Sequence, residues 1–315
     1  MKHHEITNPI STVELQRRWS ALRSLMNDLG VDLLLAQNSN EFHGGYVKWL
    51  TDRAARHASP TTVIFPRDEP MTIIQRGAGR GEIDVPLADE QNRGVGKIWT
   101  VDSNAAVDHT KSYAAEMAVE ILQPWMPGGT IGLVGTQAMS YPFLHHLKSA
   151  LHSHARFIDI TDHIDGIKAI KSDEELARIR QTAAMQDAVL KEVIKAVRPG
   201  MKVFELTALA QYHGQLRGSE QGIFLAGAAP AGESSRPVLR HSQGHELQAG
   251  DVLSLLIENN GPGGFYAELG RTCVLGRAQQ KLLDEHAFTL EAQRHTLERR
   301  KPTQGRSSRR TVNSC

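Results

Sequence analysis

The chain has 315 residues, a length typical of about two domains. Its 36 lysine and arginine residues nearly balance its 35 aspartate and glutamate residues, and this formal charge of +1 argues against a nucleic-acid binder that relies on a basic surface. Two cysteines are too few for a disulfide scaffold, and no apolar run has the length of a signal peptide or a membrane span. The sequence therefore predicts a cytoplasmic protein with no membrane partner and no specific nucleic-acid partner.

Helices and short apolar strands alternate in the first half of the chain. Ser11 and Glu14 have the spacing of a capping box, and apolar residues then recur at helical spacing as far as Leu29, before Gly30. Strands are expected at 31–36, 61–65, 71–74, 97–101, 130–135 and 155–160, and further helices near 110–122 and 141–152. The second and third strands are expected to form a hairpin. This alternation predicts an α/β domain over residues 13–165.

Two glycine clusters in this half have spacings that resemble nucleotide-binding fingerprints. The first consists of Gly77, Gly79 and Gly81, and the second lies within 129–135. Such a fingerprint joins a strand to the start of a helix, whereas no convincing helix follows the first cluster and the second surrounds a strand. Both clusters are therefore predicted to be ordinary turns.

A long helix is predicted at the start of the second half. Ser172 and Glu175 form another capping box, and an apolar stripe predicts one helix over 173–197. A second helix is expected over 203–217. The segment 226–237 is rich in small and polar residues, so we expect it to be an exposed loop.

The segments LQAGDVLSLLIE, NNGPGG and FYAELGRTCVLG predict a β-hairpin that carries the candidate site. Glu258 and Glu268 lie symmetrically about Gly263, so in a regular hairpin their side chains face each other across the strands. Two carboxylates so close repel unless a cation, a shared proton or an arginine such as Arg271 resolves the conflict. The pair is a candidate ligand set for a divalent metal. Alternatively, the pair is solvent-exposed at the mouth of the hairpin, or the turn shifts the register by one residue.

Two sequence blocks resemble the pita-bread metallopeptidases, in their Xaa-Pro peptidase and creatinase branch. The run GIKAIKSDEELARIRQTAAMQDAVLKEVIKAVRPGMKVFEL (166–206) resembles the branch's IKS-x-x-E junction, which opens a long helix ending in Pro-Gly. The run AGDVLSLLIENNGPGGFYAELGRT (249–272) resembles its Gly-Asp strand, glycine turn and terminal Arg-Thr. The resemblance implies an α/β fold: a creatinase-type N-terminal domain over 13–165, followed by an incomplete α+β pita-bread domain over 166–298.

The resemblance also implies a site. Active members hydrolyse peptides or small C–N bonds with two divalent metals (Mn, Co or Zn), held by two Asp on the hairpin, one His and two Glu further on. In this chain Glu268 stands in the place of the second Asp and Glu258 near that of the first. An upstream His assists catalysis in the family, and His241 is the nearest candidate here. Three residues match structural positions of the hairpin: Asp251, Gly264 and Arg271.

The last segment departs from the family pattern. The run RRKPTQGRSSRRTVNSC (299–315) has six basic residues, no acidic residue and almost no apolar surface, which predicts a disordered tail. The distal metal ligands are not recognisable there, which suggests a truncated or frame-shifted gene product.

These observations predict a member of the Xaa-Pro peptidase and creatinase hydrolase family, impaired by missing ligands. Its relatives act on small peptides or small C–N substrates, and a homodimer is expected. The chain should bind divalent metal weakly or not at all. The alternatives are a non-catalytic fragment or dimerisation module, and a metal-independent creatinase-like amidinohydrolase.

Overall fold

The computed structural model describes residues 9–38, 44–54, 59–102, 113–125, 128–261 and 263–299. The predicted tail 299–315 lies outside the described residues except for Arg299. The described chain groups into two compact units. The first contains the residues up to Val189 together with His213–Gly222 and Glu258–Glu268, and the second contains Leu190–Tyr212, Ile223–Ile257 and the chain from Leu269 onward. The predicted boundary at residue 165 stays a prediction.

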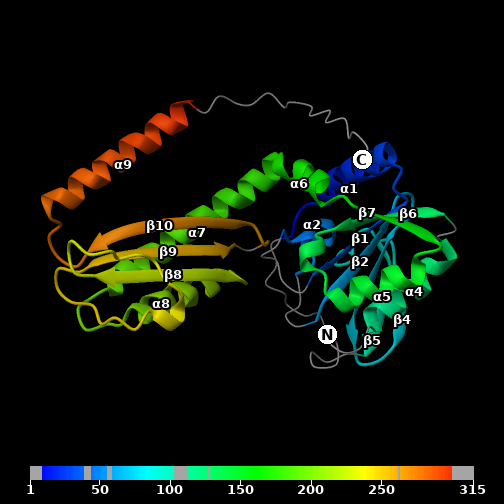
Figure 1. The fold of residues 1–315 in the computed structure, drawn as a ribbon, viewed down its shortest axis with the longest axis horizontal. Helices are drawn as coiled ribbons and strands as arrows, with labels where there is room; N and C mark the ends of the chain where they lie inside the picture. Colours follow the sequence, from blue (N-terminus) through cyan, green and yellow to red (C-terminus); the bar gives the residue numbers. More distant parts are fainter. Residues whose placement is uncertain are drawn as a thin grey trace. The chain divides into compact units, whose positions relative to one another are not determined.

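The first unit is built on a seven-stranded mixed sheet, in the order β4-β5-β3-β2-β1-β6-β7 (Figure 1). Its strands are β1 (Leu33–Asn38), β2 (Thr61–Pro66), β3 (Met71–Gly77), β4 (Gly81–Asp84), β5 (Val95–Asp102), β6 (Gly129–Val134) and β7 (Ala155–Asp159). The pairs β1–β6, β6–β7 and β3–β5 are parallel, whereas β1–β2, β2–β3 and β4–β5 are antiparallel. The predicted β2–β3 hairpin is confirmed. Strand β4, in contrast, was not predicted, because its exposed polar sequence lacks a strand pattern.

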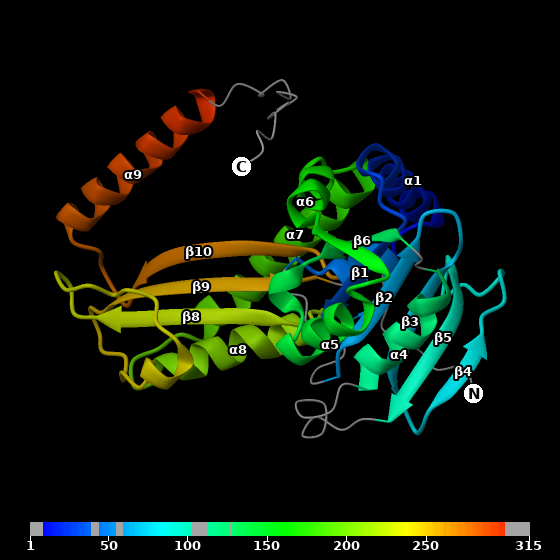
Figure 2. The ribbon, with the colours of Figure 1, turned by 45° about the vertical axis from the view of Figure 1, so that its right-hand side comes forward.

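Helices cover both faces of this sheet, as Figure 2 shows. They are α1 (Thr12–Leu29), α2 (Tyr46–Thr51), α4 (Tyr113–Leu122), α5 (Tyr141–Leu151) and α6 (Thr161–Ala169). One core joins α1, α2 and α6 to the sheet, and a second core joins α4 and α5 to it. Because side chains alternate along a strand, Leu34 of β1 lies in the first core and Leu33 and Leu35 in the second. The α/β architecture predicted for this region is confirmed.

Helix α1 begins and ends where its sequence predicts. The Ser11 hydroxyl accepts a hydrogen bond from the Glu14 N–H at 3.1 Å, and Gly30 ends the helix in the left-handed conformation with φ of 63°. The carboxylate of Glu14, however, does not form the second half of the predicted capping box. It accepts hydrogen bonds from Arg17 and Arg18, each at 2.8 Å.

Arg18 connects α1 to the start of α7 through a buried ion cluster. Its guanidinium is 2% exposed, and it lies 2.8 Å from Glu14 and 2.9 Å from Glu175. It also donates a hydrogen bond to the Trp49 carbonyl at 3.1 Å. Ser172 and Glu175 form the complete predicted capping box, with bonds of 3.0 and 3.2 Å. The carboxylate that caps α7 therefore also neutralises a buried arginine of α1.

The remaining elements comprise a three-stranded sheet in the order β10-β9-β8 and three helices. Their bounds are α7 (Asp173–Ala196), α8 (Val203–Gln215), β8 (Gly222–Ala229), β9 (Val252–Asn260), β10 (Tyr266–Val274) and α9 (Gln280–Arg299). The two helices predicted at 173–197 and 203–217 are confirmed as α7 and α8 with small shifts at their ends. No helix among the described residues is both long enough and apolar enough to cross a membrane.

The prediction of an exposed loop over 226–237 was wrong for its first four residues, which belong to β8. Ala226 is fully buried and exchanges backbone hydrogen bonds with Val238 at 3.1 and 3.3 Å. A Cβ at Gly227 would collide with the backbone of Arg236. The small residues that suggested a loop are therefore the ones that let two backbone segments pack closely.

Candidate functional site

Strands β9 and β10 form the predicted hairpin, and their register can be followed at both of its ends. At the turn, the Gly261 N–H donates to the Phe265 carbonyl at 3.0 Å. At the open end, the Leu275 N–H donates to the Asp251 carbonyl at 2.9 Å. Both pairs are symmetric about Gly263, so the register is the one expected from the sequence, without a one-residue shift.

This register places Glu258 of β9 directly opposite Glu268 of β10 on the same face of the sheet. Side chains in such a pair have Cβ atoms about 4.5–5.5 Å apart. Glu258 is half-buried, whereas Glu268 is exposed, so solvent weakens the repulsion between the two carboxylates. Arg271 lies on the exposed part of β10, where its guanidinium donates to the Gly270 carbonyl at 2.7 Å. Gly264 completes the turn with φ of 86° and donates a backbone hydrogen bond there.

The two carboxylates do not form a complete donor set for a tightly bound metal. In the part of the chain that the structure describes, no group of three or more His, Cys, Asp or Glu side chains is placed to hold a metal ion. Tight Zn, Mn or Co sites have four to six ligands, several of them from the protein. The described residues around Glu258 and Glu268 therefore do not fit such a site.

Asp251 fixes the turn that leads into β9. Its carboxylate is 3% exposed and accepts a hydrogen bond from the Gln248 N–H at 2.9 Å, and it lies 2.8 Å from His245 Nε2. Burial raises the pKa of Asp251, but the His245 and Gln248 contacts outweigh this effect and hold the pKa below its usual value. His245, which is not among the residues predicted from the sequence, is thus the partner of Asp251, a predicted structural residue.

His241, the candidate catalytic residue, lies in a short 3₁₀ helix (Arg240–Ser242) and is exposed. It belongs to the second compact unit, whereas Glu258 and Glu268 belong to the first. The catalytic role of His241 stays a prediction.

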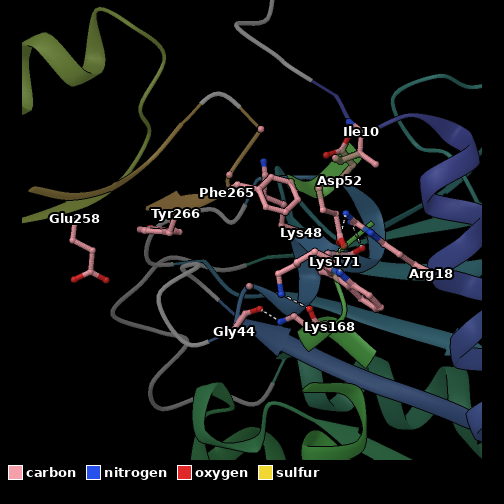
Figure 3. A pocket seen from close by; sticks show the side chains of 15 residues that line it. Ile10, Arg18, Gly44, Lys48, Asp52, Lys168, Lys171, Glu258, Phe265 and Tyr266 are labelled. Atoms are coloured by element: carbon pink, nitrogen blue, oxygen red, sulfur yellow. Dashed lines mark hydrogen bonds and ion pairs between the residues drawn. The ribbon is translucent and has the colours of Figure 1, made fainter. Parts of the chain in front are cut away.

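A cavity of about 340 Å³ in the first unit has Glu258 in its wall (Figure 3). The other walls come from α1 and the residues before it, α2, the end of α6, the start of α7 and the turn of the β9–β10 hairpin. Three lysines line it, Lys48, Lys168 and Lys171, and none of them is a candidate site residue from the sequence. Lys168 and Lys171 both lie in the segment 166–172, where their spacing alone gives no sign of a shared cavity.

The chain is similar to a family of metallopeptidases and to individual peptidases of known sequence. The model of metallopeptidase family M24 matches residues 177–310. The Xaa-Pro dipeptidase of Pyrococcus furiosus is 25% identical over 179 residues, which are 55% of this chain and 48% of the relative. An uncharacterized hydrolase/peptidase of Sinorhizobium fredii is 27% identical over 199 residues, which are 62% of this chain and 48% of the relative. The chain thus spans about half the length of the curated relatives it matches.

Solved structures share the fold over most of the chain. The prolidase of Thermococcus sibiricus matches 92% of this chain and 73% of its own, with a TM-score of 0.68 and 16% identity. The X-Pro aminopeptidase of Thermotoga maritima matches 89% of this chain and 71% of its own, with a TM-score of 0.62 and 18% identity. These matches confirm the predicted fold class.

Proposed function

We propose that the chain is a hydrolase of the Xaa-Pro peptidase branch of metallopeptidase family M24, with an impaired metal centre. The match of residues 177–310 to the family model and the shared fold support this proposal. Its substrate class would be small peptides or other small C–N compounds; the Pyrococcus furiosus relative is named as an Xaa-Pro dipeptidase, which supports the first of these. In the family, the metal supplies a polarising charge and an activated water. This chain would bind divalent metal weakly and have little peptidase activity.

The observation that carries this proposal is the opposed pair Glu258 and Glu268, with no third metal-binding side chain near it among the described residues. Each side chain is one methylene longer than the Asp that the family has on this hairpin. This added length displaces a bound ion by more than the tolerance of about 0.5 Å of a catalytic constellation. Both the number and the length of the donors therefore argue against a working dinuclear centre.

An assay on Xaa-Pro dipeptides such as alanyl-proline tests the proposal. The full chain is incubated with Mn²⁺, Co²⁺ or Zn²⁺ and, separately, with EDTA, and proline release is measured. The Xaa-Pro dipeptidase of Pyrococcus furiosus serves as the positive control. We expect proline release far below that of the positive control under every condition, and the same result for Glu268→Gln.

Two other outcomes would change the assignment. Metal-dependent turnover that disappears in Glu268→Ala would show that the hairpin carboxylates do support a working centre. EDTA-resistant hydrolysis of a small C–N substrate would instead favour the metal-independent amidinohydrolase. The homodimer and the cytoplasmic location remain predictions.

A further inference from the structure

The cavity beside Glu258 contains an unbalanced group of cations. Three lysines contribute to its wall, Lys48 from α2, Lys168 from the end of α6 and Lys171 from the segment before α7. In the view of Figure 3 the three lysines are labelled near the centre and Glu258 at the left edge. The excess of positive charge in the wall therefore favours a ligand with a negatively charged group.

The buried carboxylates in this wall already have cationic partners. Asp52 accepts hydrogen bonds from the Ile10 N–H at 2.9 Å and from Arg93 at 2.6 Å. Glu175 forms its ion pair with Arg18 at 2.9 Å. Each of these carboxylates is paired directly with an arginine, so they compensate the lysines only in part.

The lysines have much weaker partners among the described residues. The ammonium of Lys48 is 3.9 Å from Glu220, and that of Lys168 is 3.9 Å from Asp165, both beyond ordinary hydrogen-bond distance. Lys171 donates to the Lys168 carbonyl, which is neutral. The side chains of Lys48 and Lys168 are only 12% and 17% exposed, so solvent compensates them poorly.

The position of Lys168 leaves part of its donor capacity for a ligand. Its ammonium donates to the Gly44 carbonyl and lies 4.1 Å from the centroid of the Tyr46 ring. Burial and the hydrogen bond to Asp165 raise the pKa of Tyr46 to about 12, so the ring is a neutral phenol and does not neutralise the lysine. An ammonium has three N–H donors, and one contact of this kind uses only one of them.

The rest of the wall favours an anion that also has an apolar part. Trp49, Phe265 and Ile10 supply apolar surface. The carboxylate of Glu258 in the same wall disfavours a dianion such as phosphate. The volume of about 340 Å³ lies within the range of small-molecule sites.

We propose that this cavity binds a small organic monocarboxylate. Its carboxylate lies among Lys48, Lys168 and Lys171, and its apolar body lies against Trp49 and Phe265. The inference goes beyond the proposed hydrolase function, because it needs neither a metal nor a bond-breaking step.

Titration calorimetry of the full chain with 3-phenylpropionate, in the presence of EDTA, tests the proposal. We expect saturable one-to-one binding of 3-phenylpropionate. The affinity for the neutral 3-phenylpropionamide should be lower by about tenfold or more, because the charge-assisted contact is lost. The affinity for inorganic phosphate should also be lower by about tenfold or more, because its second charge is repelled by Glu258. Lys48→Met and Lys171→Met should each lower the affinity for 3-phenylpropionate by about tenfold. Lys171→Arg should retain most of the affinity because it keeps the charge.

Lys195→Met is the matched control, because Lys195 is an exposed lysine of α7 outside the cavity wall. It should leave the affinity unchanged, and circular dichroism verifies the fold of each variant. Absence of binding to the unaltered chain, equal binding of acid and amide, or equal binding of phosphate would overturn the proposal. So would unchanged affinity in both folded lysine variants. Since the titrations contain EDTA and no peptide, failure here is distinguishable from failure of the proposed hydrolase function.

Discussion

Replacing Arg18 with methionine is expected to lower the free energy of unfolding by about 3–5 kcal/mol. The substitution leaves the buried carboxylates of Glu14 and Glu175 without their shared arginine. Burial raises the pKa of Glu14, but hydrogen bonds from Arg17 and Arg18 outweigh it and lower the pKa to about 2. Without Arg18, part of that compensation is lost and the buried charges cost their desolvation energy.

Chemical denaturation at pH 7 measures this effect. Arg80→Met is the matched control, because Arg80 is 61% exposed and pairs with an exposed Glu120. An exposed pair of this kind contributes about 0–1 kcal/mol. If Arg18→Met costs no more than Arg80→Met, the buried cluster does not have the structural role assigned to it.

The second large effect is the pH dependence of stability caused by Lys168. Burial is the main reason that its pKa is lowered to about 8. The nearby cations Lys171 and Arg18 lower the pKa further, whereas the carboxylates of Asp165 and Glu175 raise it and so oppose part of the shift. Between pH 8 and the ordinary value of 10.5, the unfolded chain therefore binds more protons at this lysine than the folded chain does. The charged lysine destabilises the fold by about 3 kcal/mol below pH 8, and this penalty disappears as the pH rises to 10.5.

Lys168→Met removes this penalty, so the variant should be the more stable protein at pH 7, by somewhat less than 3 kcal/mol because the bond to Gly44 is lost. Unfolding curves of both proteins between pH 7 and 10.5 should converge as the pH rises. Lys195→Met controls for the loss of one lysine. A constant difference between the unaltered chain and Lys168→Met across this range would contradict the assignment.

Local patterns predicted the elements whose structure depends on nearby residues. Ser172 and Glu175 predicted the start of α7 because a capping box involves only four consecutive residues. The symmetry about Gly263 predicted that Glu258 faces Glu268, because a tight glycine turn fixes the register of its hairpin. Amino-acid composition was misleading at Ala226, where small residues suggested a loop but instead let strand β8 pack closely against the segment that contains Val238.

The long-range contacts could not be predicted from the sequence. Arg18 and Glu175 are 157 residues apart, and Trp49 lies 126 residues from the same carboxylate. The cavity lined by Lys48 and Lys168 depends on these contacts, since it forms only where separate helices meet. Secondary-structure propensity and the spacing of residues along the chain carry no information about which distant helices pack together.

The claim that the hairpin carboxylates do not constitute a tight metal centre is tested most directly by calorimetric titration with Mn²⁺ and Zn²⁺. The unaltered chain, Glu258→Gln and Glu268→Gln are compared under the same conditions. We expect binding no tighter than about millimolar, with little change in either variant, because two carboxylates alone hold a divalent ion poorly. Submicromolar binding that is lost in Glu268→Gln would contradict the account and identify the hairpin as a functional metal site.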